Sequence, residues 1–243
     1  MIINFKGNET YIGTGGRSLD SNKTTICFLH GSGQNHLSFV QQARFFAFKG
    51  YSIIVPDMPG HGFSKGKPLN SIKENANWVY ELLVELEVQE LVIVGHSQGC
   101  LVGLELNRLY PEFLKGIIFV AGSNEIPVNQ FLLDLSKEDP QKASKMMVTW
   151  GHGIDGDMSI NNWPGHSHYG EGNNIMNMNS ADALQHDLHS CNNYSDGVEA
   201  SKKINIPSLA ILAKNDQMTP LKLSLIHISE PTRPRLISYA VFC

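Results

Sequence analysis

Short apolar runs alternate along the first half of the chain with longer segments whose apolar residues recur every three to four positions. The short runs are typical of buried strands, and the longer segments have the spacing of amphipathic helices. This alternation predicts βαβ units and therefore a parallel sheet. The strand and helix pairs are residues 24–29 with 37–49, residues 52–55 with 71–86, and residues 91–94 with 98–110.

Two further strand-like runs occupy residues 116–121 and 207–213, and the second is rich enough in Ile, Leu and Ala to be buried on both faces. Between them the composition shifts to Met, Asn, His and Gly. Helical spacing returns near residues 128–150 and 181–190, whereas residues 159–179 are irregular. We therefore expect a helical insertion over the sheet, without strands of its own.

Composition narrows the class of protein. With 243 residues, 42% hydrophobic and 17% charged, the chain fits one globular domain. Its net charge is only -4, and the sequence contains no cluster of Lys and Arg residues. Both features argue against nucleic acid and membrane surfaces as partners. Residues 1–11 lack the features of a signal peptide and no apolar run could span a bilayer, so the expected location is the cytoplasm. No disulfide framework or zinc site is indicated by the scattered Cys27, Cys100, Cys191 and Cys243.

A Gly-x-Ser-x-Gly motif follows the apolar run at residues 91–94 and opens a helix. In that context the serine, Ser97, sits on a tight strand-to-helix turn, and Gly95 and Gly99 keep the turn free of side chains. The backbone N–H of Gln98 and the helix start both point toward a developing oxyanion. Ser97 is therefore the predicted nucleophile, and Gln98 the first predicted oxyanion donor.

Two glycine-rich turns follow the earlier strands. The first turn, His30-Gly31-Ser32-Gly33, directly follows the predicted strand at residues 24–29. In an alternation of parallel strands and helices with the serine at this later turn, the N–H of Ser32 is the predicted second oxyanion donor. Residues 57–64 close the next strand with turn residues that carry a loop over the carboxyl edge of the sheet. An architectural role is predicted for Asp57, with a catalytic carboxylate as the alternative.

Together and in this order, the three motifs resemble those of the α/β-hydrolase superfamily, specifically its cap-bearing serine hydrolases and esterases. The resemblance covers about residues 1–222 and implies a mostly parallel sheet with helices on both faces. It implies that Asp216 is the catalytic acid, although Lys214 or Asn215 stands where the family commonly has Gly. The expected division is an N-terminal core (1–122), a helical cap (123–201), a core strand with the acid loop (202–222) and a tail (223–243).

The implied activity is hydrolysis of a carboxylic ester, or a related acyl bond, of a small apolar substrate. An acyl-Ser97 intermediate would form without a cofactor or metal. A carbon-carbon bond hydrolase is the enzymatic alternative, and a non-catalytic hydrolase-fold binding protein is the alternative from another class. Acyl length, alcohol group, physiological role and oligomeric state are not readable from the sequence.

The triad also needs a histidine, which the resemblance places about 25 to 30 residues after the acid. Only His227 follows Asp216, and it follows too soon to leave room for a helix, a strand and their loops. Residues 223–233 resemble a translated transposase adapter used in DNA library preparation, and residues 237–243 resemble the sequencing adapter that follows it. We therefore expect residues 223–243 to be artefactual and the natural chain to continue past Lys222. The chain as written should then show little triad-dependent turnover, an open sheet edge and poor solubility.

The remaining candidate functional residues lie in the predicted insertion and in the Gly-x-Ser-x-Gly motif. We expect His96 to be a packing or hydrogen-bonding residue that faces away from the substrate. The insertion's histidines are expected to make polar loop contacts rather than bind metal; they are His152, His166, His168, His186 and His189. The insertion's Met and Trp residues are expected either to line the substrate pocket or to pack in the core of the insertion. They are Met146, Met147, Trp150, Trp163, Met176 and Met178.

Overall fold

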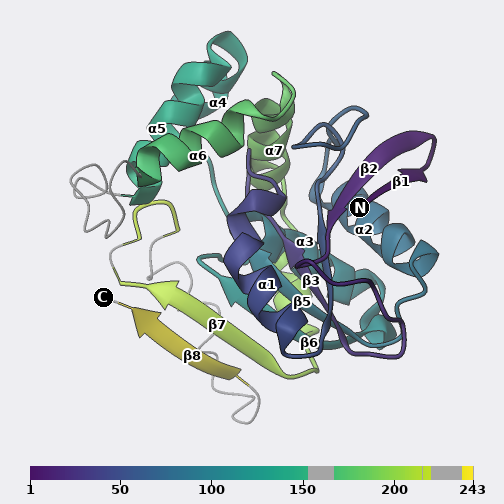
Figure 1. Cartoon of the computed structure of the whole chain (residues 1–243). Coiled ribbons are helices and arrows are strands. Elements are labelled where there is room, and N and C mark those ends of the chain that lie inside the picture. The colour runs from purple at the N-terminus through teal and green to yellow at the C-terminus, as the bar shows by residue number, and fades with distance from the viewer. Residues whose placement is uncertain (153–166, 215, 220–236, 243) are drawn as a thin grey trace.

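A computed structural model describes residues 1–152, 167–214, 216–219 and 237–242. Its centre is an eight-stranded sheet with the strand order β1-β2-β4-β3-β5-β6-β7-β8 (Figure 1). The first two strands are antiparallel to their neighbours, and the strands from β4 to β8 run parallel. The bounds are β1 Ile2–Phe5, β2 Asn8–Gly13, β3 Thr25–Leu29, β4 Ser52–Pro56, β5 Leu91–His96, β6 Leu114–Val120, β7 Ser208–Ala213 and β8 Ile237–Phe242.

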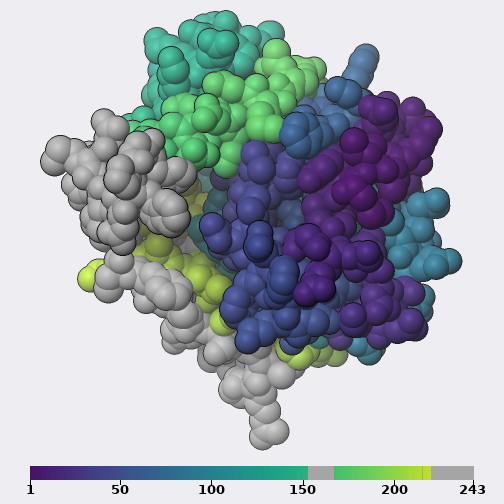
Figure 2. Space-filling view, viewed as in Figure 1, coloured from purple at the N-terminus to yellow at the C-terminus, as the bar shows by residue number. Residues whose placement is uncertain are grey.

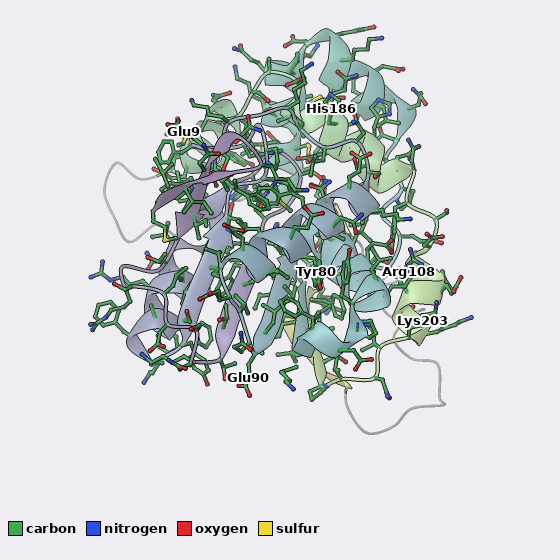
Figure 3. All side chains as sticks on the ribbon, turned by 90° about the vertical axis from the view of Figure 1, so that its right-hand side faces the viewer. Glu9, Tyr80, Glu90, Arg108, His186 and Lys203 are labelled. Atoms are coloured by element: carbon green, nitrogen blue, oxygen red, sulfur yellow. The ribbon has the colours of Figure 1, made fainter. Side chains whose placement is uncertain are left out.

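Helices cover both faces of the sheet, which confirms the predicted α/β architecture. The short helix η1 and α1 cover one face, and α2, α3 and α8 cover the other. Tyr80 of α2 and Arg108 of α3 lie on this second side (Figure 3). The bounds of these helices are η1 His36–Phe39, α1 Val40–Phe48, α2 Ile72–Glu85, α3 Gln98–Leu109 and α8 Gly197–Lys202; a further short helix, η2 Pro111–Phe113, follows α3.

Strand β3 shows why the sheet is buried on both faces. Ile26 and Phe28 pack with α1, whereas Cys27 and Leu29, which alternate with them, pack with α2 and α3. Because successive side chains of a strand point to opposite faces, a continuous apolar run needs a covering layer on each side. The run at residues 25–29 is fully buried, as the sequence predicts.

Four helices form a layer above the carboxyl ends of the strands (Figure 1). We call them the α4–α7 layer, which lies above α1 in the view of Figure 2. The layer has its own apolar core, to which Leu132, Leu135, Leu184 and Leu188 contribute. Its helices are α4 Gln130–Glu138, α5 Pro140–His152, α6 His168–Asn177 and α7 Ala183–Asn192. The division of the chain into core and cap remains a prediction.

Three local features differ from the sequence-based expectations. The β1–β2 hairpin was not predicted, because its strands are short and half exposed; its turn has positive φ at Lys6 and Gly7. The helical stretch at residues 128–150 is two helices, since Pro140 begins α5. Residues 168–177, expected to be irregular, form α6, whose first turn is capped by the Ser167 hydroxyl.

The edge of β7 is paired, so the expectation of an open edge there is wrong. Residues 237–242 form β8, parallel to β7 and in register from Ser208 with Ile237 to Ala213 with Phe242. Ile, Tyr, Val and Phe in this strand favour extended structure, which explains how a sequence that resembles an adapter adds to the sheet. Residues 223–236, including His227, lie outside the described residues. Among the described helices, none is long and apolar enough to cross a membrane.

Candidate active site

Ser97 occupies a strained turn between β5 and α3. Its φ of 51° and ψ of −116° place a non-glycine residue in a conformation that L-residues rarely adopt. A Cβ on Gly95 would lie 2.3 Å from the carbonyl oxygen of Gly99, and a Cβ on Gly99 would lie 2.2 Å from that of Leu29. Both glycines are therefore required by close backbone approach, as the motif predicts.

Substitution of Gly99 by alanine is expected to lower the free energy of unfolding by about 3 kcal/mol or more, because the new methyl group overlaps backbone that cannot rotate away. Urea denaturation measures this loss. A Cβ added at Gly151 in α5 would have no atom within 4 Å, so Gly151→Ala is the control and should raise stability by up to about 1 kcal/mol. Equal stability of the two variants would contradict the packing argument.

In the loop after β3, the residues on both sides of Ser32 are held by hydrogen bonds from their backbone N–H groups. The N–H of Gly31 donates to Gln34 Oε1 at 3.1 Å, and the N–H of Gly33 donates to Asp187 Oδ2 at 2.7 Å. Gln98 is the first residue of α3, where backbone N–H groups have no partner within the helix. Both predicted oxyanion residues, Ser32 and Gln98, are buried.

Asp216 follows β7 in a loop that orders its carboxylate. One oxygen accepts the backbone N–H groups of Met218 and Thr219, both at 2.8 Å, and the other accepts the Thr219 hydroxyl at 2.9 Å. Asp216, Ser97 and Ser32 line one cavity of about 780 Å³. The structure thus brings the predicted nucleophile, acid and one oxyanion residue to a common space.

His96 also lines this cavity, which corrects the expectation that it faces away from the substrate. Its Nδ1 lies 3.0 Å from Gln34 Oε1, an acceptor, so Nδ1 carries the proton of this bond. Burial lowers the pKa of His96, although the Asp216 carboxylate opposes the shift. Among the described residues, no imidazole is hydrogen-bonded to the Ser97 hydroxyl.

The glycine-rich loop after β4 is held by a buried carboxylate. Asp57 is fully buried and accepts the backbone N–H groups of His36 at 2.7 Å and Phe63 at 2.9 Å, and it also pairs with the His36 ring. A Cβ on Gly62 would lie 2.2 Å from this carboxylate. These contacts favour the architectural role of Asp57 over the catalytic one.

A second buried cluster lies beneath the α4–α7 layer. His61 Nε2 lies 2.9 Å from Asp187 Oδ2, and the His61 ring packs 5.0 Å from the ring of His30. Burial lowers the pKa of His30 to about 4, so this ring is neutral and its Nε2 accepts the N–H of Met58. Sequence reasoning missed Asp187, although it continues the buried face of α7 marked by Leu184 and Leu188.

The α4–α7 layer supplies the other wall of the cavity. Of the residues expected in the wall or in the core of the insertion, Met147, Trp150 and Met176 line the cavity and also pack in the layer's core. Met146 belongs to that core, whereas Trp163 lies outside the described residues. His152 lines the cavity, with its Nδ1 bonded to the Val148 carbonyl.

Two other histidines of the predicted insertion, His168 and His186, make ordinary side-chain contacts. His168 stacks on His152 with ring centroids 5.9 Å apart, and His186 pairs with Asp182 at 3.8 Å. His166 is outside the described residues. Within the part of the chain that the structure describes, no three His, Cys, Asp or Glu side chains are grouped to hold a metal.

Comparison of the sequence and the fold with known proteins shows which family this chain resembles. A family model described as the alpha/beta hydrolase fold matches residues 24–148, just over half of the chain. A provisionally named esterase/lipase of Mycoplasma pneumoniae is 24% identical over 209 residues, which cover 84% of this chain and 75% of that protein. A protein of the same provisional name from Mycoplasma genitalium is 28% identical over 118 residues, 48% of this chain and 42% of that one. An esterase from Exiguobacterium antarcticum has the same fold, with a TM-score of 0.83, 16% identity and coverage of 100% of this chain and 90% of that chain.

Proposed function

Because the chain belongs to the α/β-hydrolase fold family, we propose that it is a serine hydrolase that cleaves a carboxylic ester or related acyl bond of a small apolar substrate. The observation that carries this proposal is the strained backbone of Ser97, which lines the same cavity as Asp216 and Ser32. Esterase and lipase names among the relatives are consistent with it. In this proposal the α4–α7 layer is the cap, and its Met and Trp side chains contact the acyl or alcohol group.

The reaction proceeds in two steps on Ser97. Its Oγ attacks the ester carbonyl while its proton passes to an imidazole, and the N–H groups of Ser32 and Gln98 bind the resulting oxyanion. When the tetrahedral intermediate collapses, the C–O bond to the alcohol breaks and the alcohol leaves with the proton from the imidazolium. Water then repeats the sequence on the acyl-serine, releasing the acid and restoring the hydroxyl. Asp216 stabilises the imidazolium, and no step needs a cofactor.

In this proposal the imidazole of the triad comes from outside the residues that the structure describes. We place it in the segment encoded after Lys222 in the source gene, because residues 223–243 resemble adapter sequence and His227 stands too close to Asp216. Reading the 3′ end of the gene from source DNA tests this placement. A Gly-His motif about 25 to 30 residues beyond Asp216 is the expected result. Genomic codons for the adapter-like residues would remove the ordinary base and favour a non-catalytic binding protein.

Covalent labelling tests the nucleophile. We expect a fluorophosphonate to modify Ser97 in the chain that continues as the source gene encodes it, because only an activated hydroxyl attacks such a reagent at useful rates. Intact-protein and peptide mass spectrometry locate the adduct. Ser97→Ala should abolish labelling, whereas Ser38→Ala, on η1 outside the cavity lining, should label like the parent.

Two other outcomes would redirect the assignment. If the parent protein folds and the fluorophosphonate leaves Ser97 unmodified, the enzymatic proposal fails and a binding role gains support. If Ser97 is labelled but the protein cleaves a vinylogous diketone and no simple ester, the carbon-carbon bond hydrolase is the better description. Hydrolysis of p-nitrophenyl esters that depends on Ser97 supports the proposal as stated.

A further inference from the structure

One carboxylate of the α4–α7 layer contacts three loops of the sheet. Asp187 of α7 is 4% exposed, and its Oδ2 accepts the backbone N–H of Gly33 at 2.7 Å and contacts His61 Nε2 at 2.9 Å. Its Oδ1 accepts from Gln98 Nε2 at 3.1 Å. These partners follow β3, β4 and β5, which are neighbours in the sheet order β4-β3-β5. Asp187 therefore connects the segments that follow three adjacent strands.

Two of these contacts involve the proposed oxyanion donors. Gly33 directly follows Ser32, whose amide is one donor, and Gln98 carries the other amide on its own backbone. The opposite side of the Ser32 amide is held as well, because the N–H of Gly31 is bound by Gln34 Oε1. A single side chain thus links the loop of the first donor to the residue of the second.

The charge of the cluster fits a fixed carboxylate. Burial disfavours a charge on either partner, but the mutual attraction of His61 and Asp187 prevails, raising the pKa of His61 and lowering that of Asp187. The other nitrogen of the His61 ring, Nδ1, lies 3.0 Å from the Pro59 carbonyl, so both ring nitrogens have acceptors. A buried carboxylate with three donors is fully satisfied, whereas its removal would leave the N–H of Gly33 and the His61 ring without their partner.

We propose that Asp187 is a positioning residue that sets the separation and direction of the Ser32 and Gln98 amides, so that seating of α7 on the sheet completes the oxyanion hole. The inference rests on the proposed serine hydrolase function. Asp187 does not touch the substrate in this proposal, and it acts through Gly33 and Gln98. Small displacements of preorganised donors weaken binding of the oxyanion more than binding of the neutral ester.

Substitution of Asp187 tests this role through the balance of kcat and KM. Removal of one oxyanion donor typically costs about 10²- to 10³-fold in kcat, so displaced donors in Asp187→Ala should cost about 10- to 100-fold. KM for a p-nitrophenyl ester should change by less than about threefold, because ground-state binding is retained. Asp187→Asn, which keeps one acceptor oxygen and the side-chain volume, should recover most of the loss.

A transition-state analogue separates positioning from general stability. The affinity for an aryl boronic acid, which forms a tetrahedral adduct with the serine, should fall in Asp187→Ala by about the same factor as kcat. The matched control is Asp182→Ala, which removes an exposed carboxylate at the start of the same helix, where it pairs with His186. His186 is labelled in Figure 3. This control should leave kcat, KM and boronate affinity at parental values.

The outcomes distinguish this inference from the proposed function. Unchanged kcat and boronate affinity in folded Asp187→Ala would overturn the positioning role, even if the thermal midpoint falls. If that variant does not fold, Gln98→Met removes one contact of Asp187 while keeping the Gln98 amide, and it should lower kcat by about tenfold; a parental kcat would reject the inference. Hydrolysis that survives Ser97→Ala would instead reject the proposed function.

Discussion

The longer chain proposed above, in which a segment with the triad histidine follows Lys222, is expected to hydrolyse p-nitrophenyl esters on the order of 10⁴-fold faster, in kcat, than the chain of 243 residues. The gain has a physical reason, because a serine hydroxyl is a weak nucleophile until a neighbouring base accepts its proton. Without that base, only the oxyanion donors and substrate binding accelerate the reaction. Steady-state kinetics with both chains at one pH measures the ratio.

The comparison needs a variant that separates catalysis from solubility. Ser97→Ala in the longer chain leaves the new segment in place and should return the rate to that of the 243-residue chain or below. A thermal unfolding scan of all three proteins shows whether each is folded. Similar kcat values for the two parent chains would refute the proposal that the segment after Lys222 supplies the imidazole.

Replacing Asp216 by asparagine in the longer chain is expected to lower kcat by about 10⁴-fold, since an amide cannot stabilise the imidazolium and favours the wrong tautomer. The same substitution in the 243-residue chain should change the rate little, because the acid acts only through the imidazole. Groups of a triad that act as a unit show this strong non-additivity. Rates for the two chains, each with and without the substitution, form the complete test.

The loop around Asp216 calls for a structural control. Its carboxylate accepts three hydrogen bonds from Met218 and Thr219, so asparagine could disturb the loop as well as the triad. Asp134→Asn, on the exposed side of α4, changes the same functional group at a site where the carboxylate accepts from Gln130 Nε2 at 2.7 Å. That variant should retain parental kinetics. An equal loss of activity in both chains on Asp216→Asn would point to the loop and count against the acid role.

Local sequence is sufficient for the turn at Ser97. The strand at residues 91–96, the two flanking glycines and the helix that begins at Gln98 are all properties of one short segment, and the structure has them where the pattern predicts. The doubly covered sheet is predictable for a similar reason, because a continuous apolar run such as residues 25–29 needs cover on both sides. The β1–β2 hairpin escaped prediction because its short, half-exposed strands carry little apolar signal.

The sequence by itself determined the order of strands and helices from β3 to β6, the tight turn at Ser97 and the glycines that this turn requires. Tertiary structure decided which distant side chains meet there: Asp187 contacts Gly33 across 154 positions and Gln98 across 89, and His96 lines the cavity instead of facing away from it. Spacing along the chain predicts neighbours only within an element. Where α7 lies over the sheet depends on how the apolar faces of many elements pack together, and that packing places one carboxylate above three strands.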